Sequence, residues 1–344
     1  MHTFGPDAEE TPILTVRNVS KGFGKKRVLS NLFFTIKKGE IFGIVGQSGA
    51  GKTTLLQLLV GFIAPDTGEV LFRPEHLLLK KEQITTEFKN VLKERNEVAR
   101  MFGFATQHPS FYDRLTVEEN LKYFARLYNI SPNIMQTNIT TALELVGLAD
   151  ERNTLGGSLS GGMEKRLDIA CALVHDPRVL ILDEPTADLD IVLRRQMWHL
   201  IKRINSKGTT IIIASHFLQE METLCHRVAI LHDKKIKAIG GVDELKDLFS
   251  KSDEITIRAA PGNYAQIAHA LRKEKLNIER MGTRENSMVI YSKESEYVLH
   301  HLIHILDKLG ESLIDVEVKR PSLDEIFESI VKHGVEYNHE EEKI

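Results

Sequence analysis

A glycine-rich stretch, GQSGAGKTT, spans Gly46–Thr54 and carries the strongest chemical pattern in the chain. It fits the spacing G-x-x-x-x-G-K-[ST], in which glycines let backbone N–H groups turn toward phosphate oxygens. In this pattern Lys52 places a positive charge beside the β- and γ-phosphates, and Thr53 can hold Mg²⁺. The predicted nucleotide-binding residues are Gly46, Gln47, Ser48, Gly49, Ala50, Gly51, Lys52, Thr53 and Thr54.

A pair of carboxylates follows a second apolar run, VLILDEPT, and ends it with Asp183 and Glu184. Open α/β sheets build their sites at the carboxyl ends of such strands. Asp183 would orient Mg²⁺ or its water, and Glu184 would polarise an attacking water as a general base. Taken alone, an Asp-Glu pair after a strand is more often a solvated turn; beside a phosphate loop, the chemical interpretation is favoured.

A second glycine-rich segment, GGSLSGGMEKRLDIA, covers Gly156–Ala170. It places Gly161 and Gly162 in the opening turns of a predicted helix, where glycine costs about 1 kcal/mol relative to alanine. A helix start with bare backbone N–H groups and hydroxyls suits an anion. The chain therefore has two predicted anion-binding segments more than a hundred residues apart.

The elements that must position these residues alternate between strands and helices. The run EIFGIVG before the phosphate loop is continuous and apolar, as buried parallel strands are, and the apolar helix LLQLLVGF follows the loop. Strands are also expected in ILTVRNV, VLSNLFFTI, GTTIIIASH and RVAILHDKKI. This alternation predicts an α/β fold with a mainly parallel sheet. An inserted helical subdomain is expected at about 108–174, with Thr116 and Glu119 spaced as a capping box.

Residues 75–100 form a highly charged segment in which Ile84, Phe88, Val91 and Val98 recur at helical spacing. This periodicity predicts one amphipathic helix. A solvated helix lying on the domain is the simpler interpretation, and a partner-docking helix is the alternative.

The strand and helix order changes beyond Asp253. EITIRA, NYAQIAHALRKE, NIERMGTRENSMVIYS, EYVLHHLIHILDKLG and LIDVEVKR read in turn as strand, helix, hairpin, helix and strand. The order βαββαβ is ferredoxin-like, and SLDEIFESIV predicts a terminal helix. The expected domains are a flexible leader at 1–12, an α/β core at 13–245, an accessory domain at 253–332 and an acidic tail at 333–344.

Composition narrows the class of protein. The 344 residues have 45 basic and 48 acidic side chains, for a formal charge of −3, without a dense basic block. No nucleic-acid partner is therefore expected. Cys171 and Cys225 lie in apolar surroundings as predicted buried thiols, which is typical of a reducing compartment. No run approaches the roughly 20 apolar residues that span a bilayer, and the polar N-terminus is no secretory signal, so we expect a soluble protein.

With these motifs in this order, residues 13–245 resemble the nucleotide-binding subunits of ATP-binding cassette (ABC) transporters. The resemblance rests further on LSGGMEKR at Leu159–Arg166, which matches the family signature, and on ADLD at Ala187–Asp190, which matches the D-loop. It also assigns Gln107 to the Q-loop, His216 to the switch histidine and Phe23 to the aromatic that stacks on adenine.

The resemblance implies a cofactor set of ATP and Mg²⁺ and a head-to-tail pair of chains. The signature of one chain would face the ATP held by the phosphate loop of the other, which accounts for two anion-binding segments. The residues implied to act on the partner's ATP are Leu159, Ser160, Gly161, Gly162 and Met163, with Asp188 and Asp190 in the D-loop. Glu184 and His216 are the implied catalytic residues, and Thr53, Gln107 and Asp183 the implied metal ligands.

The segment SGGMEKRLDIA, with Met163 where the commonest signature has glutamine, looks like the drug-resistance and antibiotic-export branch. That likeness implies an ATPase that powers a separate permease with about six helices per subunit, at the cytoplasmic face of a membrane. Pro109, Phe111 and Tyr112 could contribute to permease docking, although core packing is the default for aromatics. The alternatives are a soluble ABC ATPase acting on ribosomes, DNA or assembly, and a nucleotide-binding regulator with little turnover.

Overall fold

The computed structural model describes residues 12–74, 88–249, 253–274, 276–284 and 286–319, together with Leu323 and Phe327. These residues divide into two compact units, one ending at Gly241 and one beginning at Val242. The predicted leader before Pro12, the acidic tail and most of the predicted terminal helix lie outside the described residues.

A six-stranded sheet forms the centre of the first unit, in the order β10-β9-β3-β8-β7-β6. Its strands are β3 (Ile41–Val45), β6 (Phe102–Ala105), β7 (Val179–Asp183), β8 (Thr210–Ser215), β9 (Arg227–His232) and β10 (Lys235–Gly241). All neighbours are parallel except β9 and β10, which form an antiparallel hairpin. Every residue of β3, β7 and β8 is buried, which explains their continuous apolar sequences and confirms the predicted α/β class.

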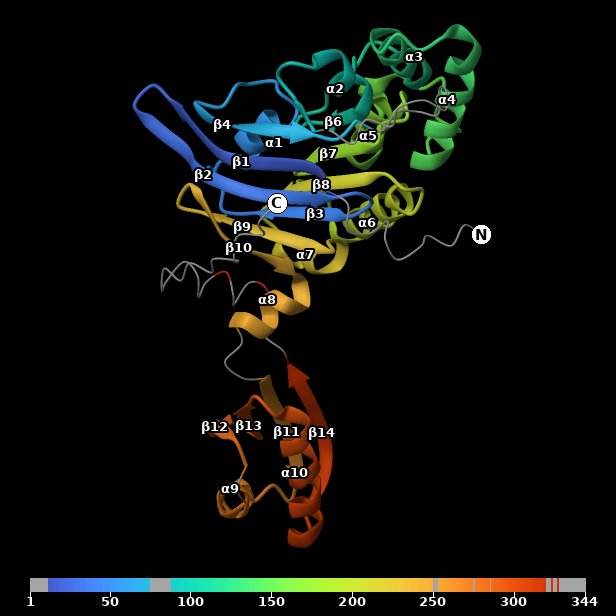
Figure 1. The fold of residues 1–344 in the computed structure, drawn as a ribbon. Coiled ribbons are helices and arrows are strands. Elements are labelled where there is room, and N and C mark those ends of the chain that lie inside the picture. The colour runs from blue at the N-terminus through green and yellow to red at the C-terminus, as the bar shows by residue number, and fades with distance from the viewer. Residues whose placement is uncertain are drawn as a thin grey trace, which may run out of the picture. The chain divides into compact units, whose positions relative to one another are not determined.

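A separate antiparallel sheet packs over the first, in the order β2-β1-β4-β5. Its strands are β1 (Pro12–Phe23), β2 (Lys26–Lys37), β4 (Thr67–Phe72) and β5 (Lys89–Asn90). Helix α1 (Lys52–Leu59) lies between the two sheets (Figure 1), and its Leu55, Leu56, Leu58 and Leu59 are fully buried in a core that both sheets share. The helix that follows the phosphate loop is thus held by apolar side chains on both sides.

The prediction of one amphipathic helix over 75–100 is wrong. Lys89 and Asn90 pair with Phe72 and Leu71 at the edge of the antiparallel sheet, and a helix, α2 (Arg95–Met101), begins only after a turn. Val91 and Val98 are buried as expected, but the open edge of β4 offers backbone hydrogen bonds that outweigh helical periodicity. Ile84 lies outside the described residues.

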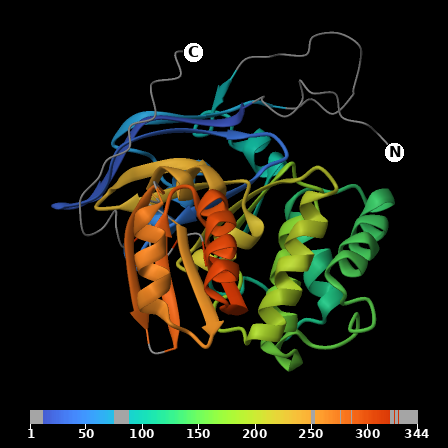
Figure 2. The ribbon, with the colours of Figure 1, turned by 90° about the horizontal axis from the view of Figure 1, so that it is seen from below.

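Three helices follow β6 in the chain and precede β7: α3 (Val117–Leu127), α4 (Pro132–Val146) and α5 (Gly161–Leu173). Figure 2 shows these green and yellow-green helices gathered on one side of the unit. The predicted capping box is confirmed, because Glu119 N–H donates to Thr116 Oγ1 at 3.2 Å and Thr116 N–H donates to Glu119 Oε2 at 2.8 Å. Helices α6 (Ile191–Asn205) and α7 (Leu218–Leu224) lie on the face of the central sheet opposite α1.

The second unit begins with α8 (Val242–Phe249) and continues as β11 (Asp253–Ala260), α9 (Tyr264–Lys273), β12 (Ile278–Arg284), β13 (Ser287–Ser292), α10 (Ser295–Leu309) and β14 (Ser312–Lys319). Its sheet has the order β12-β13-β11-β14, with every neighbouring pair antiparallel. Helices α9 and α10 cover one face of this sheet (Figure 2), where Ile257, Ile290 and Leu302 are buried. The predicted ferredoxin-like order is therefore confirmed.

Candidate functional site

The loop between β3 and α1 requires glycine where its backbone turns most sharply. Gly49 and Gly51 have φ angles of 80° and 107°, a region that side chains other than glycine avoid. A Cβ on Gly46 would lie 2.5 Å from the carbonyl oxygen of Leu231. Gln47, Ser48 and Gly49 are exposed, so the loop presents its backbone outward from the C-terminal end of β3.

The Lys52 side chain lies almost completely buried under this loop. Its Nζ donates to the carbonyl oxygens of Gly46 at 2.9 Å and Gln47 at 3.4 Å, and it lies 3.2 Å from Glu184 Oε1. The side chains of Lys52 and Glu184 are only 7% and 8% exposed. Because breaking a buried ion pair leaves an uncompensated charge, each group holds the other in place.

Thr53 and Asp183 form the second contact of the site. Thr53 Oγ1 donates to Asp183 Oδ2 at 2.7 Å, whereas the buried Asp183 Oδ1 has no hydrogen-bond partner among the described residues. Burial raises the pKa of Asp183, and the hydrogen bond from Thr53 opposes that rise. A hydroxyl beside a carboxylate with an unused oxygen is a donor set of the hard oxygen type that Mg²⁺ prefers.

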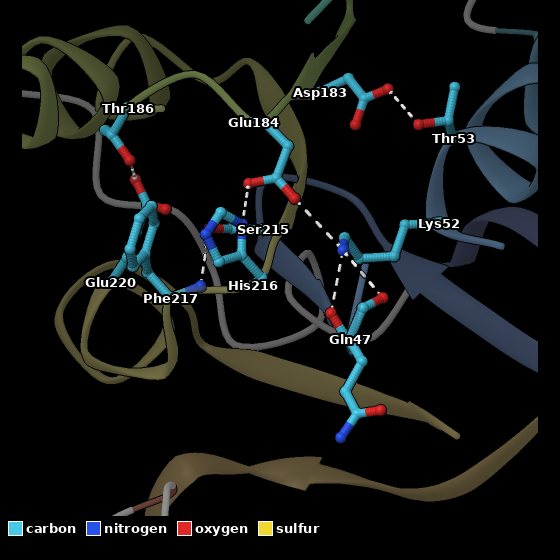
Figure 3. A network of polar contacts seen from close by, with 11 residues as sticks. Gln47, Lys52, Thr53, Asp183, Glu184, Thr186, Ser215, His216, Phe217 and Glu220 are labelled. Carbon is cyan, nitrogen blue, oxygen red and sulfur yellow. Dashed lines mark hydrogen bonds and ion pairs between the residues drawn. The ribbon is translucent and has the colours of Figure 1, made fainter. Parts of the chain in front are cut away.

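Glu184 and His216 form the third contact of the site, shown in Figure 3. His216 Nδ1 lies 2.8 Å from Glu184 Oε2, and the imidazole is 40% exposed. Glu184 has a φ angle of 52°, which is costly for a non-glycine residue. Its N–H donates to the carbonyl of Ala214 at 2.8 Å, so β8 holds the strained backbone.

A buried carboxylate that no sequence motif indicated, Glu220, lies beside this pair. Glu220 on α7 accepts hydrogen bonds from Thr186 and from Trp198, and Figure 3 shows it next to Ser215 and His216. The available signal was an acidic residue among the apolar side chains of LQEMETL, of which Leu218, Met221 and Leu224 are also buried.

The predicted Q-loop residue lies apart from these contacts. Gln107 is exposed, and its carbonyl oxygen accepts from Lys165 Nζ of α5 at 2.6 Å. Asp168 of α5 also binds this loop, because its Oδ1 accepts from Ser110 N at 2.8 Å and from Ser110 Oγ at 2.7 Å. In the described part of the chain, no hydrogen bond joins Gln107 to Thr53.

Phe23 ends β1 with its ring 52% exposed. Lys21 Nζ lies 5.4 Å from the ring centroid. Asp66 braces this strand end, because Lys21 Nζ lies 3.1 Å from Asp66 Oδ1 and the N–H of Gly22 donates to Asp66 Oδ2 at 2.8 Å. An exposed ring on a braced strand suits stacking on a flat ligand.

The signature segment forms a second group, separate from the phosphate loop. Ser160 precedes α5 as its N-cap residue without a side-chain capping bond. A Cβ on Gly161 would meet no atom within 4 Å, whereas one on Gly162 would lie 3.2 Å from Leu193. Leu159 is buried, Met163 is half-buried, and Ser160 and Gly161 are exposed.

The predicted D-loop lies in the chain between the paired carboxylates, Asp183 and Glu184, and α6. Asp190 Oδ1 accepts from the N–H of Leu193 at 2.8 Å and so caps α6, while Asp188 is exposed with a φ angle of 64°. Of the aromatics predicted for docking, Phe111 is buried against Gly156, and Tyr112 is 48% exposed.

Comparisons with known proteins agree on one family. The model of the ABC transporter family matches residues 29–187. The linearmycin resistance ATP-binding protein LnrL of Bacillus subtilis (strain 168) is 28% identical, over 92% of this chain and 97% of its own. The Nod factor export ATP-binding protein I of Rhizobium sp. (strain N33) is 30% identical, over 91% and 95%.

Solved structures give the same family. The structure of cbiO1 from Clostridium perfringens, part of the ABC transporter complex cbiONQ, superposes with a TM-score of 0.59 at 27% identity, covering 69% of this chain and 91% of that one. Among the described residues, no helix has both the length and the apolar character needed to cross a membrane. The phosphate loop, the paired carboxylates and the relatives all agree on one family. This chain belongs to the ABC transporter family of ATPases, as one of the ATP-binding proteins.

Proposed function

We propose that this chain binds Mg-ATP at the loop of Gly46–Thr54 and hydrolyses it with Glu184 as the general base. The observation that carries the proposal is the connected set of short contacts from Lys52 through Glu184 to His216. A general base is oriented by groups within hydrogen-bond reach of it. Both Lys52 and His216 lie within that distance of Glu184.

The proposed metal ligands are Thr53 and Asp183, with Gln107 joining them when the Q-loop approaches. The unused oxygen of Asp183 and its bond to Thr53 support this assignment. A magnesium ion would neutralise charge on the phosphate oxygens. The backbone N–H groups around Gly49 and Gly51 and the ammonium of Lys52 bind the phosphates themselves.

In the proposed reaction Glu184 accepts a proton from the attacking water, and its other oxygen is oriented by the imidazole of His216. Lys52 exchanges its contact with Glu184 for the phosphates, which frees that carboxylate for the water. Phe23 stacks on the adenine, and Gly51 allows the phosphates to approach the start of α1.

The exposed signature supports a head-to-tail homodimer. In it, Leu159, Ser160, Gly161, Gly162 and Met163 of one chain act on the ATP of the other. Asp188 and Asp190 of the D-loop lie between the two sites. ATP shifts the population toward the closed pair because it binds that state more tightly, and hydrolysis lets the pair open.

The chain is proposed to power an exporter through a separate permease with about six membrane-spanning helices per subunit, from the cytoplasmic face. The support is the near full-length similarity to proteins named for linearmycin resistance and Nod factor export. The exposed Tyr112 and the Q-loop at Gln107 are the proposed permease contacts. Co-purification of the tagged chain with such a membrane protein, lost on Tyr112→Asp, tests this part.

The decisive test of the site is Glu184→Gln. The variant should bind ATP as the native chain does, form a stable dimer with Mg-ATP, and lose turnover by about 10³-fold, as removal of a general base does. Hydrolysis rates and light scattering of the purified chain measure both outcomes. Native hydrolysis rates in the variant, or a strictly monomeric variant with saturating Mg-ATP, would overturn the assignment.

A further inference from the structure

The carboxylate of Glu220 lies in the first unit with no exposed surface. Its Oε1 accepts from Thr186 Oγ1 at 2.8 Å and from Trp198 Nε1 at 3.2 Å. Glu220 Oε2 is buried without a hydrogen-bond partner among the described residues. Three segments of the chain therefore meet at one buried acid.

Two of these segments flank the two groups proposed to do the chemistry. Thr186 follows Glu184 after one intervening residue, and helix α7, which carries Glu220, begins two residues after His216. Ser215 Oγ accepts from the N–H of Phe217 at 3.1 Å and so joins the residues on both sides of the histidine. The contacts form a ring: Glu184 leads along the chain to Thr186, the Thr186 hydroxyl bonds Glu220, the start of α7 leads back along the chain to His216, and His216 bonds Glu184 (Figure 3).

Keeping this acid buried has an energetic cost. Burial raises the pKa of Glu220, and the charge of Glu184 adds to that rise, while hydrogen bonds from Thr186 and Trp198 oppose it. A buried carboxylate costs free energy unless hydrogen bonds or an opposite charge compensate it. The hydrogen bonds of Glu220 fix the direction of its partners. An apolar side chain in the same space would fill the volume without fixing any direction.

The backbone of Glu184 is the part of the site that such a directional contact would stabilise. Its φ of 52° is strained, and strained residues persist only where the surroundings fix them from several sides. The bond from Glu184 N–H to Ala214 fixes one side at 2.8 Å. The bond from Thr186 to Glu220 fixes the other side, beyond Pro185.

We propose that Glu220 is a positioning residue that sets Glu184 and His216 against each other by joining the segment after Glu184 to helix α7, which begins two residues after His216. It does not touch the nucleotide; it acts through the two groups that do. The inference rests on the proposed function, since it assigns a role relative to that catalytic pair.

The test compares Glu220→Leu, Glu220→Gln and Thr186→Val in the full-length chain. Glu220→Leu removes the acceptor, Glu220→Gln keeps an oxygen that accepts from Thr186 and Trp198, and Thr186→Val removes only the hydroxyl. The matched control is Thr223→Val on the same helix, because among the described residues Thr223 Oγ1 bonds only the Gln219 carbonyl of its own turn, at 2.8 Å.

We expect Glu220→Leu and Thr186→Val to lower kcat by about tenfold or more with the ATP dissociation constant within twofold, since small displacements of catalytic groups cost rate. Glu220→Gln should recover kcat to within about threefold, and the Thr223 control should match the native chain. In a His216→Ala background, Glu220→Leu should lower kcat less than twofold further, because residues that act through one group are not additive.

The inference is overturned if the Leu and Val variants keep native kcat, if ATP affinity falls in parallel with kcat, or if the Glu220 and His216 losses multiply in full. Should Glu220→Leu fail to fold, Thr186→Val and its combination with His216→Ala decide the matter in the same way. The two proposals fail differently: an unmodified chain that does not hydrolyse ATP contradicts the proposed function, whereas unchanged variants of an active chain contradict only the role of Glu220.

Discussion

The two glycine-rich segments of this chain differ in how completely they are satisfied by their own polypeptide. At the phosphate loop, Lys52 bonds two carbonyls and a carboxylate, and Thr53 bonds Asp183. At the signature, Ser160 makes no capping bond and Gly161 faces open space. The side chains of Lys52 and Thr53 are bonded within their own chain, whereas the exposed start of α5 lacks a side-chain cap.

The difference separates two reasons for using glycine. Gly51 is needed for its own fold, because its φ of 107° excludes most side chains. Gly161 has no such need within the chain, since a methyl group there would meet nothing within 4 Å. A helix start that could hold any small residue but holds glycine is best explained by a surface that approaches from outside.

Gly161→Asp tests whether a nucleotide approaches the signature from outside the chain. The acid would favour the N-terminal end of α5, so the unfolding free energy should not fall, yet it would repel phosphates of a facing nucleotide. Turnover should drop by about 10²-fold or more, as on loss of one oxyanion donor. ATPase assays and urea denaturation measure the pair of effects. Lys207→Gln, an exposed position with the same change in net charge, is the control and should keep native activity.

A mixture of two inactive variants tests whether the sites are shared between chains. Lys52→Ala damages only the phosphate loop, and Gly161→Asp damages only the signature. In a head-to-tail dimer the mixed pair has one doubly damaged site and one intact site, so an equimolar mixture should regain about a quarter of native turnover. Each variant alone should remain inactive. Recovery of no activity, with mixed dimers verified by differential tags, would refute the shared sites.

The buried carboxylate of Asp183 should lower the free energy of unfolding at neutral pH. The raised pKa of Asp183 means that the folded chain binds its proton more readily than the unfolded chain does. Stability from that neutral form is therefore present at low pH and lost as the pH rises above the ordinary value of 3.8. Asp183→Asn should raise the unfolding free energy at pH 7 by about 1 kcal/mol without nucleotide, and reduce the decline between pH 4 and 7. A native pH profile in the variant would contradict this.

Alanine substitutions at the two glycines of the signature should differ slightly in their effect on the unfolding free energy. Gly161→Ala should raise the unfolding free energy by about 0.5 kcal/mol, because alanine restricts the unfolded chain. Gly162→Ala should gain less, since its methyl group would lie 3.2 Å from Leu193. Urea denaturation of both variants measures the difference. An equal gain at both positions would show that Leu193 moves aside at no cost.

Sequence patterns were sufficient to place residues that lie close together in the chain at the end of a buried strand. Gly46–Thr54 follows β3, Asp183 and Glu184 end or follow β7, and His216 follows β8. Because these parallel strands are neighbours, their carboxyl ends meet without further information. The ferredoxin-like order was predictable for a similar reason, since the period of its apolar residues changes between strands and helices.

Contacts that depend on distant partners were not predictable in this way. Lys89 and Asn90 were expected in a helix, and only the edge of β4 makes them a strand. Glu220 was overlooked because its role depends on Thr186 and Trp198, which lie 34 and 22 residues away. Gln107 carries a motif yet bonds Lys165 through its backbone, which no spacing rule indicates.

One ammonium group, that of Lys52, lies between the loop carbonyls and the carboxylate of Glu184 at 3.2 Å. A phosphate that draws this cation away would leave the Glu184 carboxylate without its ion pair. In the proposed reaction, capture of the nucleotide and release of the base from Lys52 would then be a single event.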